Sequence, residues 1–225
     1  MSADDQGAGE PELPARRDAL RIIGMAPVFA ALGWNQEGVE RAARFVGELP
    51  AAPLDEAYAP KFFVAREWRT VRLLADYVIP RDAHSGSAND AKAPEFVDFM
   101  LMDSTTSEST RLAMRGGLAW LDTECRHRFG TTFVGATDAQ RRLVLDDIAW
   151  PKKAPPELSS GVAFFTRFRD SIASAFYSSP MGWKDLQYMG NVFNPNWDGC
   201  PEPALRKLGV SYAEYDASLA AQRGR

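Results

Sequence analysis

The stretch SGVAFFTRFRDSIASAFY, residues 160–177, decides the fold class of this chain. Its apolar residues recur at spacings of three and four, which places them on one face of an α-helix. This face is formed by Phe164, Phe165, Phe168, Ile172 and Phe176. It is the heaviest aromatic stripe in the chain, and it predicts a helix that contributes one face to a hydrophobic core.

The same spacing predicts two further core helices upstream, between residues 64 and 101. The first carries its apolar face on Val64, Trp68, Val71, Ala75 and Val78. Pro80 stops it, because proline cannot continue the hydrogen-bond ladder of a helix. The second has Pro94 in its first turn, where the missing N–H costs nothing, and is strongly apolar.

Two more core helices are expected between residues 111 and 149. The longer one buries a stripe formed by Met114, Leu118, Leu121, Cys125 and Phe129. Gly130 follows that stripe at the usual C-terminal position. The shorter one begins with a capping box, in which the side chains of Thr137 and Gln140 bond each other's backbone N–H, and reaches about Ala149. Its inward-facing residues are predicted to be Leu143, Val144 and Ile148.

The fold predicted from these patterns is all-α, because no alternating strand pattern of useful length interrupts the helices. We expect an irregular helical domain of about five core helices over residues 61–210, starting near Lys61. A short helix and a Pro/Ala-rich linker occupy residues 35–60, and a helical tail occupies residues 211–225. The aromatic, Gly- and Asn-rich segment near the C-terminus is expected to be non-helical.

Composition excludes several functional classes. The 225 residues carry a net charge of −4, with 45% hydrophobic and 25% charged residues, which is ordinary for a soluble globular domain. Nucleic acid is not an expected partner, because no dense Lys/Arg stripe is present. Two cysteines cannot alone supply a disulfide framework or a tetrahedral metal site, and neither belongs to a haem-attachment motif.

The N-terminus has the layout of an export signal. Arg16 and Arg17 precede an apolar run, Ile22 to Leu32, that is too short to span a membrane. Paired arginines at this place favour the twin-arginine route, so residues 1–34 are interpreted as an export signal and the protein as periplasmic. Ala19 and Pro27 depart from that pattern, and the alternative is an ordinary amphipathic N-terminal helix.

Catalytic motifs for nucleotides, phosphates or acyl transfer are absent from the sequence. His84 and His127 are interpreted as surface histidines, because neither has a neighbouring group to hold it as a base. The adjacent Asp146 and Asp147 resemble a paired carboxylate site but are more typical of a solvated helix face.

The two cysteines differ in their surroundings. Cys125 belongs to an apolar stripe and is expected to be a buried, inert thiol. Cys200 stands between Gly199 and Pro201 in a loop. In an oxidising periplasm it could pair with Cys125 or with another chain, and otherwise it is a free loop thiol.

The stretch GWKDLQYMGNVFNPNWDGCP, residues 182–201, is the most unusual in composition. Its glycines, prolines and asparagines do not favour helix propagation. Aromatic residues interleaved with turn residues describe either a cap over the protein's own core or a surface that meets another protein.

Five pieces in order carry a resemblance to a known family. They are LLADYVIP (73–80), APEFVDFM (93–100), GLAWLD (117–122), FGTTF (129–133) and GWKDLQYMGN (182–191). Together they resemble the gluconate 2-dehydrogenase subunit 3 family, over about residues 68–210. The ending Trp197-Asp198-Gly199-Cys200 is similar to the family's ending, with Asp198 in place of proline. The run GWKDLQYMGN is the specific part of the likeness.

The resemblance implies a non-catalytic partner of a larger flavin-bearing subunit of the glucose–methanol–choline type. That partner would hold FAD, oxidise a sugar or sugar acid, and pass electrons to a cytochrome c or a quinone. The resemblance implies no cofactor in this chain, and it agrees with the twin-arginine signal. Oxidation at the sugar 3-position, as in glucoside 3-dehydrogenases, is a related possibility.

The surface predicted to grip the flavoprotein lies in the unusual C-terminal segment. Its residues are Trp183, Tyr188, Asn191, Phe193, Trp197 and Cys200. One alternative is a stand-alone enzyme that uses carboxylates such as Asp146, Asp147 or Asp185. Another is a cytoplasmic helical binding module that retains residues 16–32 as a docking helix. No membrane-spanning segment is expected in any of the three.

Overall fold

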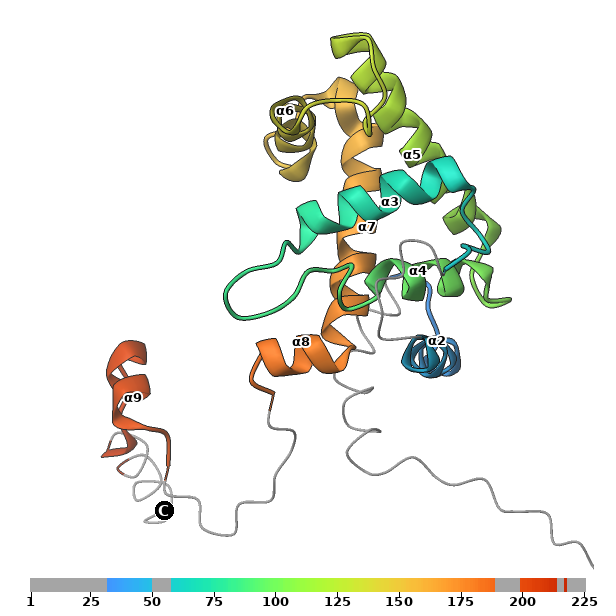
Figure 1. Cartoon of the computed structure of the whole chain (residues 1–225). Helices are drawn as coiled ribbons and strands as arrows, with labels where there is room; N and C mark the ends of the chain where they lie inside the picture. Colours follow the sequence, from blue (N-terminus) through green and yellow to red (C-terminus); the bar gives the residue numbers. More distant parts are fainter. Residues whose placement is uncertain (1–31, 50–57, 189–198, 214–216, 218–225) are drawn as a thin grey trace, which may run out of the picture. The chain divides into compact units, whose positions relative to one another are not determined.

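The computed structural model describes residues 32–49, 58–188, 199–213 and 217, and every regular element within them is a helix (Figure 1). This confirms the all-α class. The chain divides into two compact units, Met1–Gly190 and Asn191–Arg225. The first unit holds α2 (Gln36–Glu48), α3 (Ala65–Val78), α4 (Ala93–Met102), α5 (Glu108–Phe129), α6 (Asp138–Ala149), a 3-10 turn (Pro156–Leu158), α7 (Ser159–Tyr177) and α8 (Pro180–Asp185). The second unit holds α9 (Glu202–Leu208).

Helix α7 lies at the centre of the first unit. It contacts α3, α4, α5, α6 and α8, and Figure 1 shows it as a long upright helix crossed by α3. All five residues of its predicted aromatic stripe are buried. The other core helices therefore pack around one apolar face, as the spacing of the stripe predicts.

Helices α5 and α7 approach closely because each places a glycine under an aromatic ring of the other. A Cβ atom on Gly117 of α5 would lie 1.9 Å from the ring of Phe164. A Cβ atom on Gly161 of α7 would lie 2.2 Å from the ring of Trp120. Any larger side chain at either glycine would force the two helices apart.

The predicted ends of the core helices agree with the structure. Gly130 ends α5 in the left-handed conformation, with φ at 71°. The capping box of α6 is formed as predicted, with Gln140 N donating to Thr137 Oγ1 at 3.3 Å and Thr137 N donating to Gln140 Oε1 at 2.9 Å. Pro94 lies in the first turn of α4.

Two predicted inward-facing residues are exposed instead. Leu143 is 58% exposed, and Leu145 is buried in its place beside Val144 and Ile148. The buried face of α6 is centred one position further along the chain than predicted, which turns Leu143 about 100° away from it. Val64 is also exposed, because α3 begins only at Ala65.

The core also takes residues from upstream of Lys61, where the sequence placed the start of the folded domain. Leu32, Trp34, Val39 and Ala42 are all buried in the same cluster as the central helices. The last two lie on α2, which packs against α4. Residues 50–57 of the predicted linker and most of the predicted tail lie outside the described residues.

Candidate docking surface at helix α8

The first residues of the unusual segment, predicted to be non-helical, form part of the six-residue helix α8. Ser179 starts this helix by accepting a hydrogen bond from Gly182 N at 3.1 Å. Its hydroxyl also donates to the carbonyl of Phe176 at 2.6 Å, and Pro180 follows at the first helical position. A serine cap followed by proline is a start signal in the sequence that the composition of the segment obscured.

Gly182 determines how α8 sits against the end of α7. A Cβ atom at this position would lie 2.3 Å from the carbonyl oxygen of Phe176 and 2.7 Å from the Cα of Tyr177. Both of these are backbone atoms, which cannot rotate away. Glycine is therefore required for this close approach of the two helices.

The other end of α8 is closed by two crossed hydrogen bonds. Tyr188 N donates to the Trp183 carbonyl at 2.9 Å, and Gln187 N donates to the Lys184 carbonyl at 3.0 Å. Gln187 adopts a left-handed backbone, with φ at 52°. This is a Schellman cap with glutamine where glycine is usual. The cap fixes the backbone of Tyr188 relative to that of Trp183.

The α8 cap presents apolar side chains to solvent. Leu186 is 59% exposed and Tyr188 is 42% exposed, while Trp183 is half-buried. The loop after α3 borders α8, because a Cβ atom on Gly86 would lie 2.9 Å from the sulfur of Met181. We define the docking surface as Trp183, Leu186 and Tyr188 on this cap.

The loop that borders the docking surface is held by carboxylates. Asp82 accepts hydrogen bonds from Ser85 N at 2.8 Å and His84 N at 2.7 Å, and these lower the pKa of the Asp82 carboxyl. Arg81 pairs with Asp90 at 2.7 Å. The loop therefore has its own internal order, and His84 is exposed, as predicted.

Only part of the predicted gripping surface can be placed. Trp183 and Tyr188 lie together on the α8 cap, and Leu186 is an exposed residue that the sequence reasoning missed. Asn191, Phe193 and Trp197 lie outside the described residues, as do Arg16 and Arg17 of the predicted export signal. Cys200 lies in the second unit.

The second unit has a local arrangement around Cys200. Gly199 has φ at 90°, and a Cβ atom there would lie 2.9 Å from the ring of Tyr212. Cys200 N donates to the Tyr212 hydroxyl at 2.8 Å. Both cysteines are free, with Cys200 exposed and Cys125 buried in α5. The predicted burial of Cys125 is therefore confirmed, and because burial raises the pKa of the Cys125 thiol to about 11, we expect this thiol to stay protonated and unreactive.

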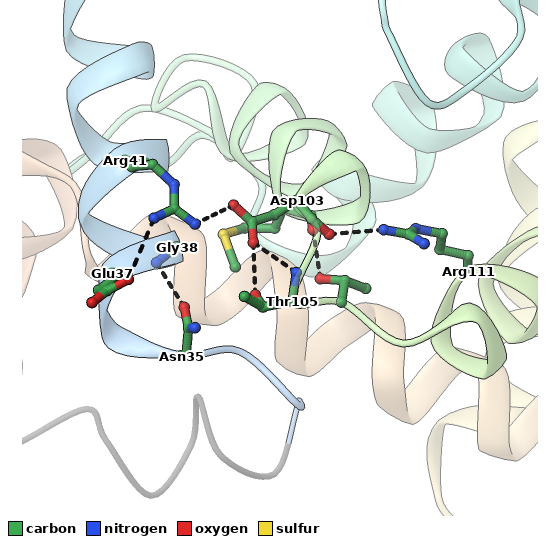
Figure 2. Close-up of polar contacts among 9 residues, drawn as sticks. Asn35, Glu37, Gly38, Arg41, Asp103, Thr105 and Arg111 are labelled. Atoms are coloured by element: carbon green, nitrogen blue, oxygen red, sulfur yellow. Dashed lines mark hydrogen bonds and ion pairs between the residues drawn. The ribbon is translucent and has the colours of Figure 1, made fainter.

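A polar cluster joins α2 to the end of α4 (Figure 2). The buried carboxylate of Asp103 accepts from Arg41 at 2.6 Å and from the Thr105 hydroxyl at 2.7 Å. Arg111 donates to the backbone carbonyl of Asp103 at 2.7 Å. Burial alone would raise the pKa of Asp103, but the bonds from Thr105 and Arg41 hold the pKa at about 2. This cluster holds α2 in place.

Lys92 provides a second attachment for α2. Its ammonium group donates to the carbonyls of Val46 at 3.4 Å and Leu49 at 2.6 Å, which caps the C-terminal end of that helix. Helix α2 is thus held near its middle through Arg41 and at its C-terminal end by Lys92, and residues 32–49 belong to the folded first unit.

Buried carboxylates explain two of the sequence pieces quoted above. Asp98 accepts hydrogen bonds from the backbone N–H groups of residues 61–63 at 2.7–3.0 Å and from the Tyr58 hydroxyl at 2.8 Å. It thereby fixes the chain that leads into α3. Asp122 accepts from Phe133 N at 3.0 Å and fixes the loop after α5. These aspartates hold backbone groups that would otherwise be buried without partners.

The carboxylates of the alternative enzyme do not gather in one place. Asp146 and Asp147 are exposed on α6, and Asp147 pairs with Arg128 at 2.6 Å. Asp185 lies on α8. Among the described residues, no group of three or more His, Cys, Asp or Glu side chains is arranged to hold a metal ion.

A comparison with protein-family models identifies the family of this chain. The model of the family described as gluconate 2-dehydrogenase subunit 3 matches residues 65–198, more than half of the chain. The chain belongs to the gluconate 2-dehydrogenase subunit 3 family. The family match runs from the first residue of α3 through the α8 cap. No curated protein and no solved structure matched the chain.

Membership of the gluconate 2-dehydrogenase subunit 3 family makes the chain an accessory subunit of a dehydrogenase complex. Within the part of the chain that the structure describes, no helix has the length and apolar character needed to cross a lipid bilayer.

Proposed function

We propose that this chain is the non-catalytic small subunit of a periplasmic, FAD-dependent sugar or sugar-acid dehydrogenase of the glucose–methanol–choline type. Its role is to support assembly, stability and export of the flavin-bearing subunit. FAD belongs to that larger subunit, which passes its electrons to a cytochrome c or a quinone. The chain docks on the flavin subunit through the α8 docking surface.

The observation that carries this proposal is the exposure of Leu186 and Tyr188 on a rigid cap, inside the segment matched by the family model. Both side chains stand on backbone that is already fixed by the Schellman bonds. Binding would therefore cost little backbone entropy. Tyrosine is also enriched among residues that dominate binding energy, because it buries a large area with few rotamers.

Purification of the complex from the native host tests this function. A tagged copy of the full chain is expected to bring down a larger protein with flavin absorbance, and haem absorbance would reveal a cytochrome. A wild-type preparation that carries no flavin would contradict the proposal. Sugar oxidation by the isolated chain would favour the carboxylate enzyme instead.

Variants of the α8 cap then test whether this cap contacts the flavin subunit. The double change Leu186→Asp and Tyr188→Ala should weaken association by about 2 kcal/mol or more, roughly thirtyfold in Kd. The matched control is Leu112→Asp, which alters an equally exposed leucine, 63% accessible, on α5. Equal flavin recovery with the double variant and the control would show that the α8 cap is not part of the interface.

A substitution at Trp183 distinguishes docking on the flavin subunit from packing against the protein's own core. If its half-buried ring mainly covers the protein's own core, Trp183→Ala should lower the unfolding free energy of the isolated chain and leave flavin recovery unchanged. We expect loss of flavin recovery at a protein concentration where the variant remains folded by circular dichroism.

Export is tested separately from docking. Changing Arg16 and Arg17 to lysine should keep the chain and its flavin partner in the cytoplasmic fraction, because the twin-arginine route reads the arginine pair. Periplasmic flavin protein at the wild-type level in this double variant would overturn the export role and leave the docking role standing.

A further inference from the structure

Glu95 is an acidic residue buried in the first turn of α4, with 1% of its surface exposed. Within the part of the chain that the structure describes, its Oε2 atom has no hydrogen-bond partner. Asp98, one turn further along α4, is also buried but accepts hydrogen bonds from the backbone of residues 61–63 and from the Tyr58 hydroxyl. A buried carboxylate without hydrogen bonds costs far more free energy than a buried neutral carboxyl group. Glu95 is therefore expected to keep its proton in the folded chain.

The charges around Glu95 oppose one another. Arg72 of α3 and Lys92, which precedes α4, lower the pKa of Glu95, whereas burial and Asp98 raise it. Burial has the largest effect, so the pKa of Glu95 lies above its ordinary value. Tyr58, before α3, also lies close enough to feel the charge of Glu95.

Of the two cations near Glu95, Lys92 is the one with a competing role. Arg72 Nε donates to Asn89 Oδ1 at 3.1 Å, which fixes that side chain. The ammonium group of Lys92 instead donates to the carbonyls of Val46 and Leu49 at the end of α2. A carboxylate is a stronger acceptor for an ammonium group than a neutral carbonyl is, and residues three positions apart in a helical turn are neighbours.

Helices α2 and α7 also contact α4, and their charged side chains are engaged or exposed. Arg41 of α2 pairs with Asp103, and Arg169 of α7 pairs with Asp170. Nearer to Lys92, the charged residues at the end of α2 are exposed, namely Arg44 and Glu48. Lys92 is therefore the cation that can respond to a charge on Glu95.

We propose that Glu95 and Lys92 make the attachment of α2 sensitive to alkaline pH. At low pH Glu95 is neutral and Lys92 caps α2. As the pH rises, Glu95 loses its proton to solvent, and the new carboxylate draws the Lys92 ammonium group away from the carbonyls of Val46 and Leu49. The pair of Arg41 and Asp103 still holds the middle of α2, so only its C-terminal end is released.

The attachment controlled in this way lies outside the family-matched part of the chain. The family model begins at residue 65, and α2 ends at Glu48. The inference therefore concerns a helix packed onto the family domain from upstream. It does not rest on the proposed docking of the flavin subunit.

The pH dependence of stability tests the protonation of Glu95 in the purified full chain. Because its pKa is raised on folding, the folded chain keeps a proton that the unfolded chain loses above the ordinary value of 4.5. This proton makes the folding equilibrium constant fall by up to about tenfold per pH unit as the pH rises from there to the folded-state pKa. Glu95→Gln, which keeps the shape but cannot ionise, should remove that fall. The matched control is Glu108→Gln, an exposed glutamate in the first turn of α5, which should leave the profile unchanged.

A carbon-13 NMR titration of the wild type tests the movement of Lys92 and needs no variant to fold. The carboxyl carbon of Glu95 should titrate at higher pH than that of Glu108. The carbonyl carbons of Val46 and Leu49 should shift with the same midpoint as Glu95, and Glu95→Gln should abolish that shift. A Glu95 midpoint no higher than that of Glu108, or Val46 and Leu49 signals that stay constant while Glu95 titrates, would overturn the proposal. Neither result bears on flavin recovery, so the proposed function stands or falls separately.

Discussion

A single methyl group at Gly182 tests the structural interpretation of the docking surface. In Gly182→Ala the new Cβ atom would lie 2.3 Å from the Phe176 carbonyl oxygen and 2.8 Å from its carbonyl carbon. Real Cβ atoms do not approach so closely, and backbone atoms of a buried helix end cannot swing aside. Helix α8 must therefore move away from α7 or open.

The size of the effect follows from two opposing terms. Overpacking typically costs about 1–3 kcal/mol, and a clash with backbone atoms that cannot rotate away places this case at about 2–3 kcal/mol, while alanine favours a helix over glycine by about 1 kcal/mol. The net loss is about 1–2 kcal/mol and falls on α8, because the clash lies at its junction with α7. A loss of that size corresponds to about 5–30-fold more opening.

Amide exchange measures this opening directly. The amides of Trp183 and Leu186 donate to the carbonyls of Ser179 and Gly182, so both bonds break when α8 opens. Their exchange should accelerate about 5–30-fold in Gly182→Ala, and flavin recovery should fall with it.

Gly116→Ala is the matched control for that experiment. A Cβ atom at Gly116, in the middle of α5, would meet no atom within 4 Å. This variant should stabilise the protein by about 0.5–1 kcal/mol. Unchanged or slower α8 exchange in Gly182→Ala would refute the reasoning that glycine is needed at the junction.

Three further outcomes are expected. Gly117→Ala should lower the unfolding free energy by about 2 kcal/mol in urea titrations, because its methyl would overlap the buried ring of Phe164; wild-type stability would contradict this. Because the pKa of Asp103 is depressed to about 2, the stability that its carboxylate provides should be complete above about pH 4 and should be lost as the pH falls toward 2. In acid titrations, the unfolding free energy of Arg41→Leu should fall less steeply over this range than that of the wild type. Gln187→Gly should raise the unfolding free energy by up to about 1 kcal/mol, because glycine accepts the left-handed cap; a decrease would show that the Gln187 side chain itself holds the cap.

The predictable part of the fold is the part that local chemistry determines. The aromatic stripe of α7, the capping box of Thr137 and the stop at Gly130 each depend on residues within one or two helical turns. Such signals survive any tertiary arrangement, so the sequence and the structure agree on them.

Residues that meet only after folding could not be predicted in the same way. Arg41 and Asp103 are 62 positions apart, and nothing in either local sequence indicates the other. The error at Leu143 has a related cause, since a helix with apolar residues at 143, 144, 145 and 148 has two possible buried faces. The position of α7 selects the face that contains Leu145.

The specific family run GWKDLQYMGN can now be interpreted one position at a time over its described part. Gly182 permits contact with α7, Trp183 and Lys184 supply the carbonyls that close the cap, and Gln187 makes the left-handed turn. This arrangement places Tyr188 at the protein surface. Under the proposed function, the run is a rigid mount for a contact residue, built against the C-terminal end of the same helix whose aromatic stripe organises the core.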